Sequence, residues 1–244
     1  MKKLFTVLAI FALIFAACEE EETDNGNDGI TWENEPDGTL EVINSTTKDF
    51  VLFHGMNPSN SSILGGIKGS TTRKFDISTY IDDFNTGGFI VIRGMTIEEY
   101  NKNKENLFNA KAQYSDMAVY GQGKNSMVEI NELSFGDYCF RVTNTVNFGI
   151  ELRKDSPEGV KIGFVPSMTA NYMLYTGSSD SITVYPVYVS FNKSTGTVTT
   201  IKPTSPAESV TVSPLSMTNP EIRTYVFPSD PDGFNQSTGD IVSP

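Results

Sequence analysis

The sequence predicts an all-β fold made of two small β-sandwich domains. Two observations predict it: from Leu40 onward, short runs rich in β-branched and aromatic residues alternate with turn residues, and these runs form two series of similar length. A third observation is a single helix signature, which lies within the first series. A chain of 244 residues with 38% hydrophobic residues can bury the cores of two such domains.

The first series extends from residue 39 to 130 and includes the helix. The run Phe89–Ile92 is apolar on both faces, which favours a central strand. Thr96 followed by Glu99 forms a capping-box signature, so we expect one short helix over 96–111. The strands expected before it are Leu40–Ile43, Phe50–Phe53, Ser62–Ile67, Lys74–Ile77 and Phe89–Ile92.

The second series extends from residue 131 to 202. Pro186 interrupts the alternation of its longest run, which is typical of a bulge at an edge position. The Pro-rich segment 203–244 contains strand-like pieces at 210–212 and 224–227, so we expect extended chain laid against the body. The expected strands are Met127–Leu133, Tyr138–Thr143, Phe148–Leu152, Lys161–Val165, Tyr172–Tyr175, Ile182–Phe191 and Thr197–Ile201.

The two series echo each other in sequence. Val42, Asn44 and Leu52 recur as Val142, Asn144 and Leu152, at a constant offset of 100. A duplicated β-domain explains this, and chance similarity stays open as the alternative. Each unit is expected to be an immunoglobulin-like or transthyretin-like sandwich.

The N-terminal residues carry an export signal. Lys2 and Lys3 precede an apolar run, Leu4–Ala17, which is too short to span a bilayer and is typical of a secretory signal peptide over residues 1–17. The sequence Ala16-Ala17-Cys18 resembles the lipobox of bacterial lipoproteins, although Phe15 departs from the usual Leu. The resemblance implies that Cys18 is the acylated first residue of an outer-membrane protein in the cell envelope. A plain secretory signal with an incidental cysteine is the alternative.

The segment 18–38 begins with Cys18 and holds nine acidic residues and no basic one. It therefore carries much of the net negative charge of the chain, which is −12. So polar a segment predicts a flexible tether from which the fold draws nothing. The acidic cluster Glu19–Glu22 resembles the surface-export signals of Bacteroidota-type lipoproteins and the tethers of spirochaete lipoproteins; a merely soluble spacer is the alternative. The small net negative charge of the rest of the chain argues only weakly against nucleic acid as a binding partner.

Candidate catalytic groups are few. His54 is the single histidine, and no GxSxG, HExxH or CxxC motif accompanies it. Cys139 lies in an alternating strand, where a half-buried structural thiol is expected rather than a nucleophile. The adjacent carboxylates Asp82 and Asp83 are the best placed pair for a glycosidase, although a solvated loop is the stronger expectation.

Candidate ligand-binding groups are also few. Asp24, Asp28 and Glu35 occupy three positions of an EF-hand-like calcium loop, without flanking helices, so an acidic linker is expected and no metal or cofactor is assigned. Four tyrosines gather in the second series and offer an aromatic face that stacks on a glycan or protein ligand, with strand packing as the alternative. They are Tyr172, Tyr175, Tyr185 and Tyr188.

These observations predict a lipid-anchored envelope protein with a non-enzymatic binding or adhesion role and no nucleic-acid partner. A pilin-like structural subunit is the first alternative, because some Bacteroidota pilins are lipoprotein precursors that are cleaved after a basic residue near the first strand. Lys48 is the only nearby candidate for that cleavage. A carbohydrate-active hydrolase with paired carboxylates is the second alternative.

Overall fold

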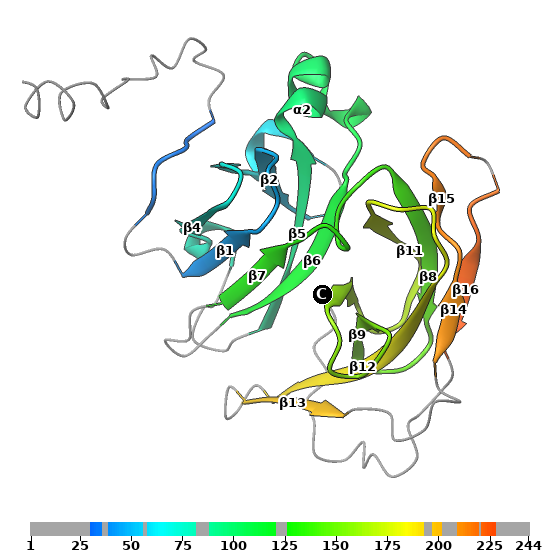
Figure 1. Ribbon diagram of the computed structural model, residues 1–244. Coiled ribbons are helices and arrows are strands. Elements are labelled where there is room, and N and C mark those ends of the chain that lie inside the picture. Colours follow the sequence, from blue (N-terminus) through cyan, green and yellow to red (C-terminus); the bar gives the residue numbers. More distant parts are fainter. Residues whose placement is uncertain are drawn as a thin grey trace, which may run out of the picture.

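A computed structural model describes residues 30–35, 39–55, 58–81, 88–120, 126–192, 197–201, 209–219 and 221–227. Strands dominate these residues and one α-helix interrupts them, which confirms the all-β class (Figure 1). The predicted signal peptide and Cys18 lie outside the described residues.

Two sheets form the N-terminal half. One has the strand order β4-β1-β7 and the other has the order β3-β2-β5-β6. Alternate residues of both sheets, such as Val42 and Leu52, pack into one apolar cluster between them. The strands are β1 (Leu40–Asn44), β2 (Phe50–His54), β3 (Ile63–Ile67), β4 (Thr71–Phe75), β5 (Gly88–Thr96), β6 (Tyr114–Tyr120) and β7 (Ser126–Ile130).

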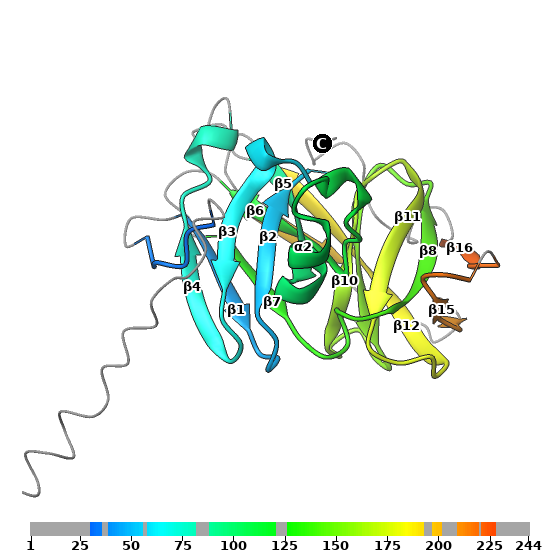
Figure 2. The ribbon, with the colours of Figure 1, turned by 90° about the horizontal axis from the view of Figure 1, so that it is seen from above.

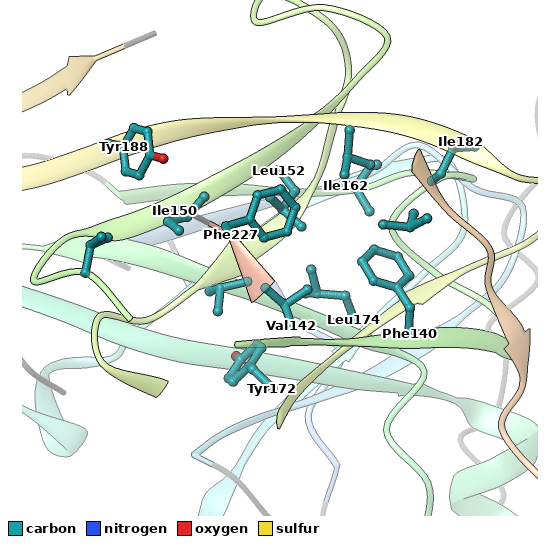
Figure 3. Packing of buried hydrophobic residues seen from close by; sticks show 14 of the residues in the cluster. Phe140, Val142, Ile150, Leu152, Ile162, Tyr172, Leu174, Ile182, Tyr188 and Phe227 are labelled. Carbon is teal, nitrogen blue, oxygen red and sulfur yellow. The ribbon is translucent and has the colours of Figure 1, made fainter. Parts of the chain in front are cut away.

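Two further sheets form the C-terminal half. One has the order β11-β8 with β15 and β16 on the other side of β8, and the other has the order β10-β9-β12-β13, with β14 also on β12. Figure 3 shows side chains of both sheets meeting in one core, with Phe227 of β16 among them. The strands are β8 (Tyr138–Asn144), β9 (Gly149–Lys154), β10 (Lys161–Val165), β11 (Thr169–Thr176), β12 (Ile182–Asn192), β13 (Thr197–Ile201), β14 (Val210–Val212), β15 (Leu215–Ser216) and β16 (Thr224–Phe227).

The strand pairings of the two halves correspond to each other, as a repeat would require. In each half the first strand pairs antiparallel with the fourth and parallel with the last. Leu52 faces Gly65 across β2 and β3, and Leu152 faces Gly163 across β9 and β10. Strands β14 and β16 coincide with the strand-like pieces that the sequence indicates at 210–212 and 224–227, and together with β15 they extend the sheets of the second half.

One buried asparagine in each half holds the same corner of the chain. The Nδ2 groups of Asn44 and Asn144 each donate to two main-chain carbonyls, at 2.7 and 3.0 Å in the first half and 2.6 and 2.9 Å in the second. Each Oδ1 accepts from the main-chain N–H two residues later. The carbonyls belong to Lys48 and Lys68 in the first half, and to Phe148 and Pro166 in the second.

Helix α2 (Ile97–Asn103) is shorter than the expected 96–111. Thr96 caps it by accepting from the N–H of Glu99, as the capping signature predicts. The Glu99 carboxylate does not complete the box, because it accepts from Asn103 Nδ2 and from the N–H of Lys111 instead. The chain after Asn103 folds into a short 3-10 turn, Leu107–Asn109, and then enters β6.

Two sequence-level expectations about strands need correction. Strand β6 was not expected, because Asp116 and Ser115 break its apolar pattern. Pro186 causes no register shift in the pairing of β12 with β9. It lies between the part of β12 that pairs with β14 and the part that pairs with β13, where no N–H is needed for a neighbouring strand.

The two halves are joined along an extensive seam, and α2 lies over it (Figure 2). Strand β6 packs against β10 and β11 of the other half. One apolar cluster includes Val51 and Tyr100 from the first half with Cys139 and Tyr175 from the second. A smaller one joins Met117 to residues of β10 and β12. The seam therefore buries apolar surface from both halves.

Residues 30–35 dock onto the first half, so the expectation of a flexible tether is wrong for these six residues. The carbonyl of Thr31 accepts from Gly66 N at 2.8 Å and from Arg73 Nη1 at 2.6 Å. The Trp32 ring lies where a Cβ on residue 66 would come within 2.6 Å of it, so only glycine fits there. Glu35 accepts from Asp76 N. We call residues 30–35 the N-terminal strap.

We expect removal of the strap to destabilise the protein. Arg73 is 4% exposed and binds the strap through its guanidinium, so a chain that begins at residue 39 leaves this cation with fewer partners. The expected loss of unfolding free energy is about 2 to 4 kcal/mol relative to a chain that begins at residue 30. Urea denaturation of both chains measures it, and equal midpoints would contradict the account.

Asn44 and Asn144 should contribute similarly to the stability of the protein. Asn44→Ala and Asn144→Ala each leave two carbonyls and one main-chain N–H without their partner, and Asn44→Ala also removes the acceptor of the Thr46 hydroxyl, so we expect each to cost about 2 to 3 kcal/mol. The exposed Asn60→Ala is the control, with little effect expected. Chemical denaturation compares the three variants; a loss confined to one half would mean that the two corners are not equivalent.

Candidate functional site

A pocket with a volume of about 290 Å³ opens at the seam between the two halves. Strand β5 contributes Arg93, the segment before β6 contributes Lys111, and β8 and β11 of the second half contribute Cys139 and Tyr175. The site therefore exists only where the two halves are packed together. Its remaining lining residues are Pro58, Ala110, Ala112, Met173 and Met217.

Arg93 is the buried cation of this pocket. Its side chain is held from the second half, because the guanidinium lies 5.2 Å from the centre of the Tyr172 ring and hydrogen-bonds to the Tyr175 side chain. The residue is only 6% exposed. A guanidinium fixed in this way presents its positive charge in one orientation, in surroundings of low polarity.

Cys139 and Tyr175 are neutral members of the lining. Burial raises the pKa of the Cys139 thiol, and Arg141 opposes this only in part. Burial likewise raises the pKa of Tyr175. Both groups are therefore protonated at neutral pH, and Cys139, which is 1% exposed, is more deeply buried than the sequence suggested. These properties disfavour a nucleophilic role for the thiol.

The rest of the lining is apolar with one exposed cation. Met173 and Met217 are half-buried, while Ala110 and Ala112 come from the segment between α2 and β6. The Glu99 carboxylate fixes that segment by accepting from the main-chain N–H of Lys111 at 3.0 Å. Asp and Glu are absent from the described lining residues, so these residues bring two cations and no carboxylate together.

An ion pair with a buried carboxylate joins the two halves across the same seam. Lys161 at the start of β10 places its Nζ 2.7 Å from the Asp116 carboxylate of β6, and that carboxylate also accepts from Met117 N. Burial raises the pKa of Asp116, and the Lys161 cation opposes the rise. The Tyr172 hydroxyl and the Ser115 hydroxyl hydrogen-bond at 2.8 Å across the same seam.

The four tyrosines do not form the exposed aromatic face that the sequence suggested. Tyr172, Tyr175 and Tyr188 are buried, and only Tyr185 is half-buried. They pack in strands, as the alternative interpretation holds. Tyr175 lines the pocket, and Tyr172 supports Arg93 behind it.

The other candidate residues from the sequence do not lie together with the pocket. The His54 ring packs 4.2 Å from the Tyr80 ring, and burial lowers its pKa, so neither observation points to catalysis. Asp82 and Asp83 lie outside the described residues, as do Asp24 and Asp28 of the calcium loop pattern. Glu35 belongs to the strap. In the part of the chain that the structure describes, no three His, Cys, Asp or Glu side chains gather as a metal site.

Sequence reasoning missed Arg93 and Lys111. Arg93 follows the apolar run Phe89–Ile92 in a strand that was expected to be central, and a cation in such a strand is a signal that could have been used. Lys111 carries no such signal, because its place depends on how the chain after α2 folds.

Comparison with known proteins gives no relative: no protein-family model matches the chain, and no curated protein or solved structure matches it. Within the described ranges, no helix has the length and apolar character needed to cross a bilayer.

We expect the Asp116–Lys161 pair to be important for stability. Asp116→Ala removes the nearer of two carboxylate partners of Lys161, whose side chain is 24% exposed and whose other partner, Glu151, lies 4.0 Å away, and the expected cost is about 3 kcal/mol. Asp155→Asn is the control, because its contact with Lys154 is exposed and 4.0 Å long. Denaturant titration of both variants provides the measurement, and similar small losses would argue that the buried pair does not hold the seam.

Proposed function

We propose that this chain is a non-enzymatic binding or adhesion protein of the bacterial cell envelope, carried on a lipid at Cys18. The observation that supports binding best is the seam pocket, which both halves line and in which Arg93 is held by Tyr172 and Tyr175. A pre-formed pocket between two packed units is a common place for a ligand. The anchor rests on the lipobox resemblance of the sequence around Cys18.

We further infer that each half is a β-sandwich and that the two arose by duplication, rather than forming four blades of a propeller-like ring. Chain order supports this inference. In the first half β1, β4 and β7 belong to one sheet while β2, β3, β5 and β6 belong to the other, so the chain crosses between sheets repeatedly. Propeller blades are built as repeated four-stranded units. The shared core of each sheet pair also suits a sandwich.

Binding without turnover is the direct test. The chain of residues 18–244 with Cys18→Ser can be applied to a glycan array and to envelope proteins, and any bound ligand analysed by mass spectrometry after long incubation. We expect the ligand to be recovered intact. Recovery of cleaved glycan would favour the hydrolase, whose proposed carboxylates Asp82 and Asp83 are then the residues to replace.

The pilin-like alternative has some support in exposed edges. Met127 of β7 and Val226 of β16 are each 61% exposed on strands that lie at sheet edges, and such edges can pair with another chain. Cleavage after Lys48 would separate β1 from the chain, although β1 is the middle strand of its sheet. An intact N-terminus at Cys18 on the mature protein would speak against this alternative.

We expect Cys18→Ser to release the protein from the membrane. The residue would carry the acyl chains, and stable anchoring requires more than one chain. The wild type should sediment with membranes, whereas Cys18→Ser should be found in the soluble fraction. Cys139→Ser is the matched control and should stay with the membrane. A Cys18→Ser protein that still resists extraction would place the anchor elsewhere.

A further inference from the structure

We propose that the seam pocket binds a small monocarboxylate with a short apolar tail, the carboxylate facing Arg93 and Lys111 and the tail lying against Met173 and Met217. This inference rests on the proposed binding function and names the ligand class of its pocket. It concerns a free small molecule, not a polymer or a protein segment.

The charge of the lining selects an anion. Arg93 and Lys111 are both cationic, while the described lining holds no carboxylate and its Cys139 and Tyr175 are neutral. An arginine that is 6% exposed acts in a less polar medium than a surface arginine, so its attraction for an anion is stronger. The planar guanidinium also matches the geometry of a carboxylate.

The side chains of the pocket lining are also pre-organised in the absence of a ligand. The ring of Tyr172 and the side chain of Tyr175 fix the guanidinium of Arg93, and Glu99 fixes the main chain at Lys111. A group that is already ordered loses less entropy when it binds a partner. The Asp116–Lys161 pair joins the two halves whose residues line the pocket.

The size and the apolar lining limit the rest of the ligand. A volume of about 290 Å³ is at the lower end of small-molecule sites, so it suits a small molecule and is too small for a chain of sugars. Met173, Met217 and the alanines of the lining offer no further charge. Methionine side chains adapt to irregular apolar shapes, which suits a short flexible tail.

Octanoate is the probe, and octanol, with the same chain length but no charge, is its matched control. Both are titrated into residues 18–244 carrying Cys18→Ser, and the methionine methyl groups are followed by NMR. Octanoate should saturate and shift the methyl signals of Met173 and Met217. Met127 and Met168 are more than 60% exposed and lie outside the pocket lining, so their signals should stay unchanged.

Octanol should bind at least about tenfold more weakly than octanoate, because it brings no charge for Arg93 and Lys111. Equal affinities would overturn the assignment of an anion. Shifts at all four of these named methionines would show that octanoate associates with the surface only, and would overturn the assignment of the pocket as its binding site. Absence of saturation by octanoate in a folded protein would likewise overturn the proposal.

Two variants distinguish a contribution of the cations to binding from a contribution to folding. Lys111→Gln changes an exposed side chain and should weaken octanoate binding about threefold, while Lys102→Gln, on α2 and outside the pocket lining, should leave it unchanged. Arg93→Gln should weaken binding at least about tenfold. If Arg93→Gln does not fold, the Lys111→Gln variant provides the test. An octanoate affinity equal to that of the unchanged protein would contradict the role of the two cations.

Failure of this inference can be told from failure of the proposed function. If octanoate does not bind but the same protein retains an intact glycan or protein partner, the pocket assignment is wrong and the binding function stands. If octanoate binds as expected, the protein is a binder whatever the arrays show.

Discussion

The arrangement of the two halves depends on the seam between them, and the ion pair between Asp116 and Lys161 joins the halves across this seam. Asp116 lies on β6, the edge strand of one half, and Lys161 begins β10, an edge strand of the other. Removing a carboxylate from water is costly, and here the lysine and the N–H of Met117 offset part of that cost. Because these partners come from both halves, the pair favours one relative placement of the two units.

The pocket is a consequence of that placement. Arg93 belongs to the first half, yet Tyr172 and Tyr175 of the second half hold its guanidinium. Neither half alone would form this site. The pocket is therefore a property of the packed pair of halves, whose strands pair in a corresponding order.

Much of the fold could be predicted from the sequence, since strand patterns and turns are local signals. The offset of 100 between Asn44 and Asn144 indicated two equivalent corners, because a buried asparagine at a corner has strict hydrogen-bonding needs. Strand β6 escaped prediction for the opposite reason: Asp116 is paired only through tertiary contact, and its charge hides the strand in the local pattern. The strap was also missed, because its affinity for the first half depends on Gly66 and Arg73, more than thirty residues away.

The candidate site was much less predictable. Its side chains come from six separate parts of the chain, and the tyrosines that looked like an exposed ligand face are mostly buried. Composition alone cannot separate a tyrosine that packs from one that binds.

The central claim is that the two halves form one cooperative unit. Trp32, the only tryptophan, reports on the first half through its packing on Gly66, and the buried thiol of Cys139 reports on the second. Urea unfolding of the chain with Cys18→Ser can be followed by tryptophan fluorescence and by thiol labelling of Cys139 in the same samples. The account predicts a single midpoint for both signals. Two separate midpoints would show that the halves unfold independently and would contradict it.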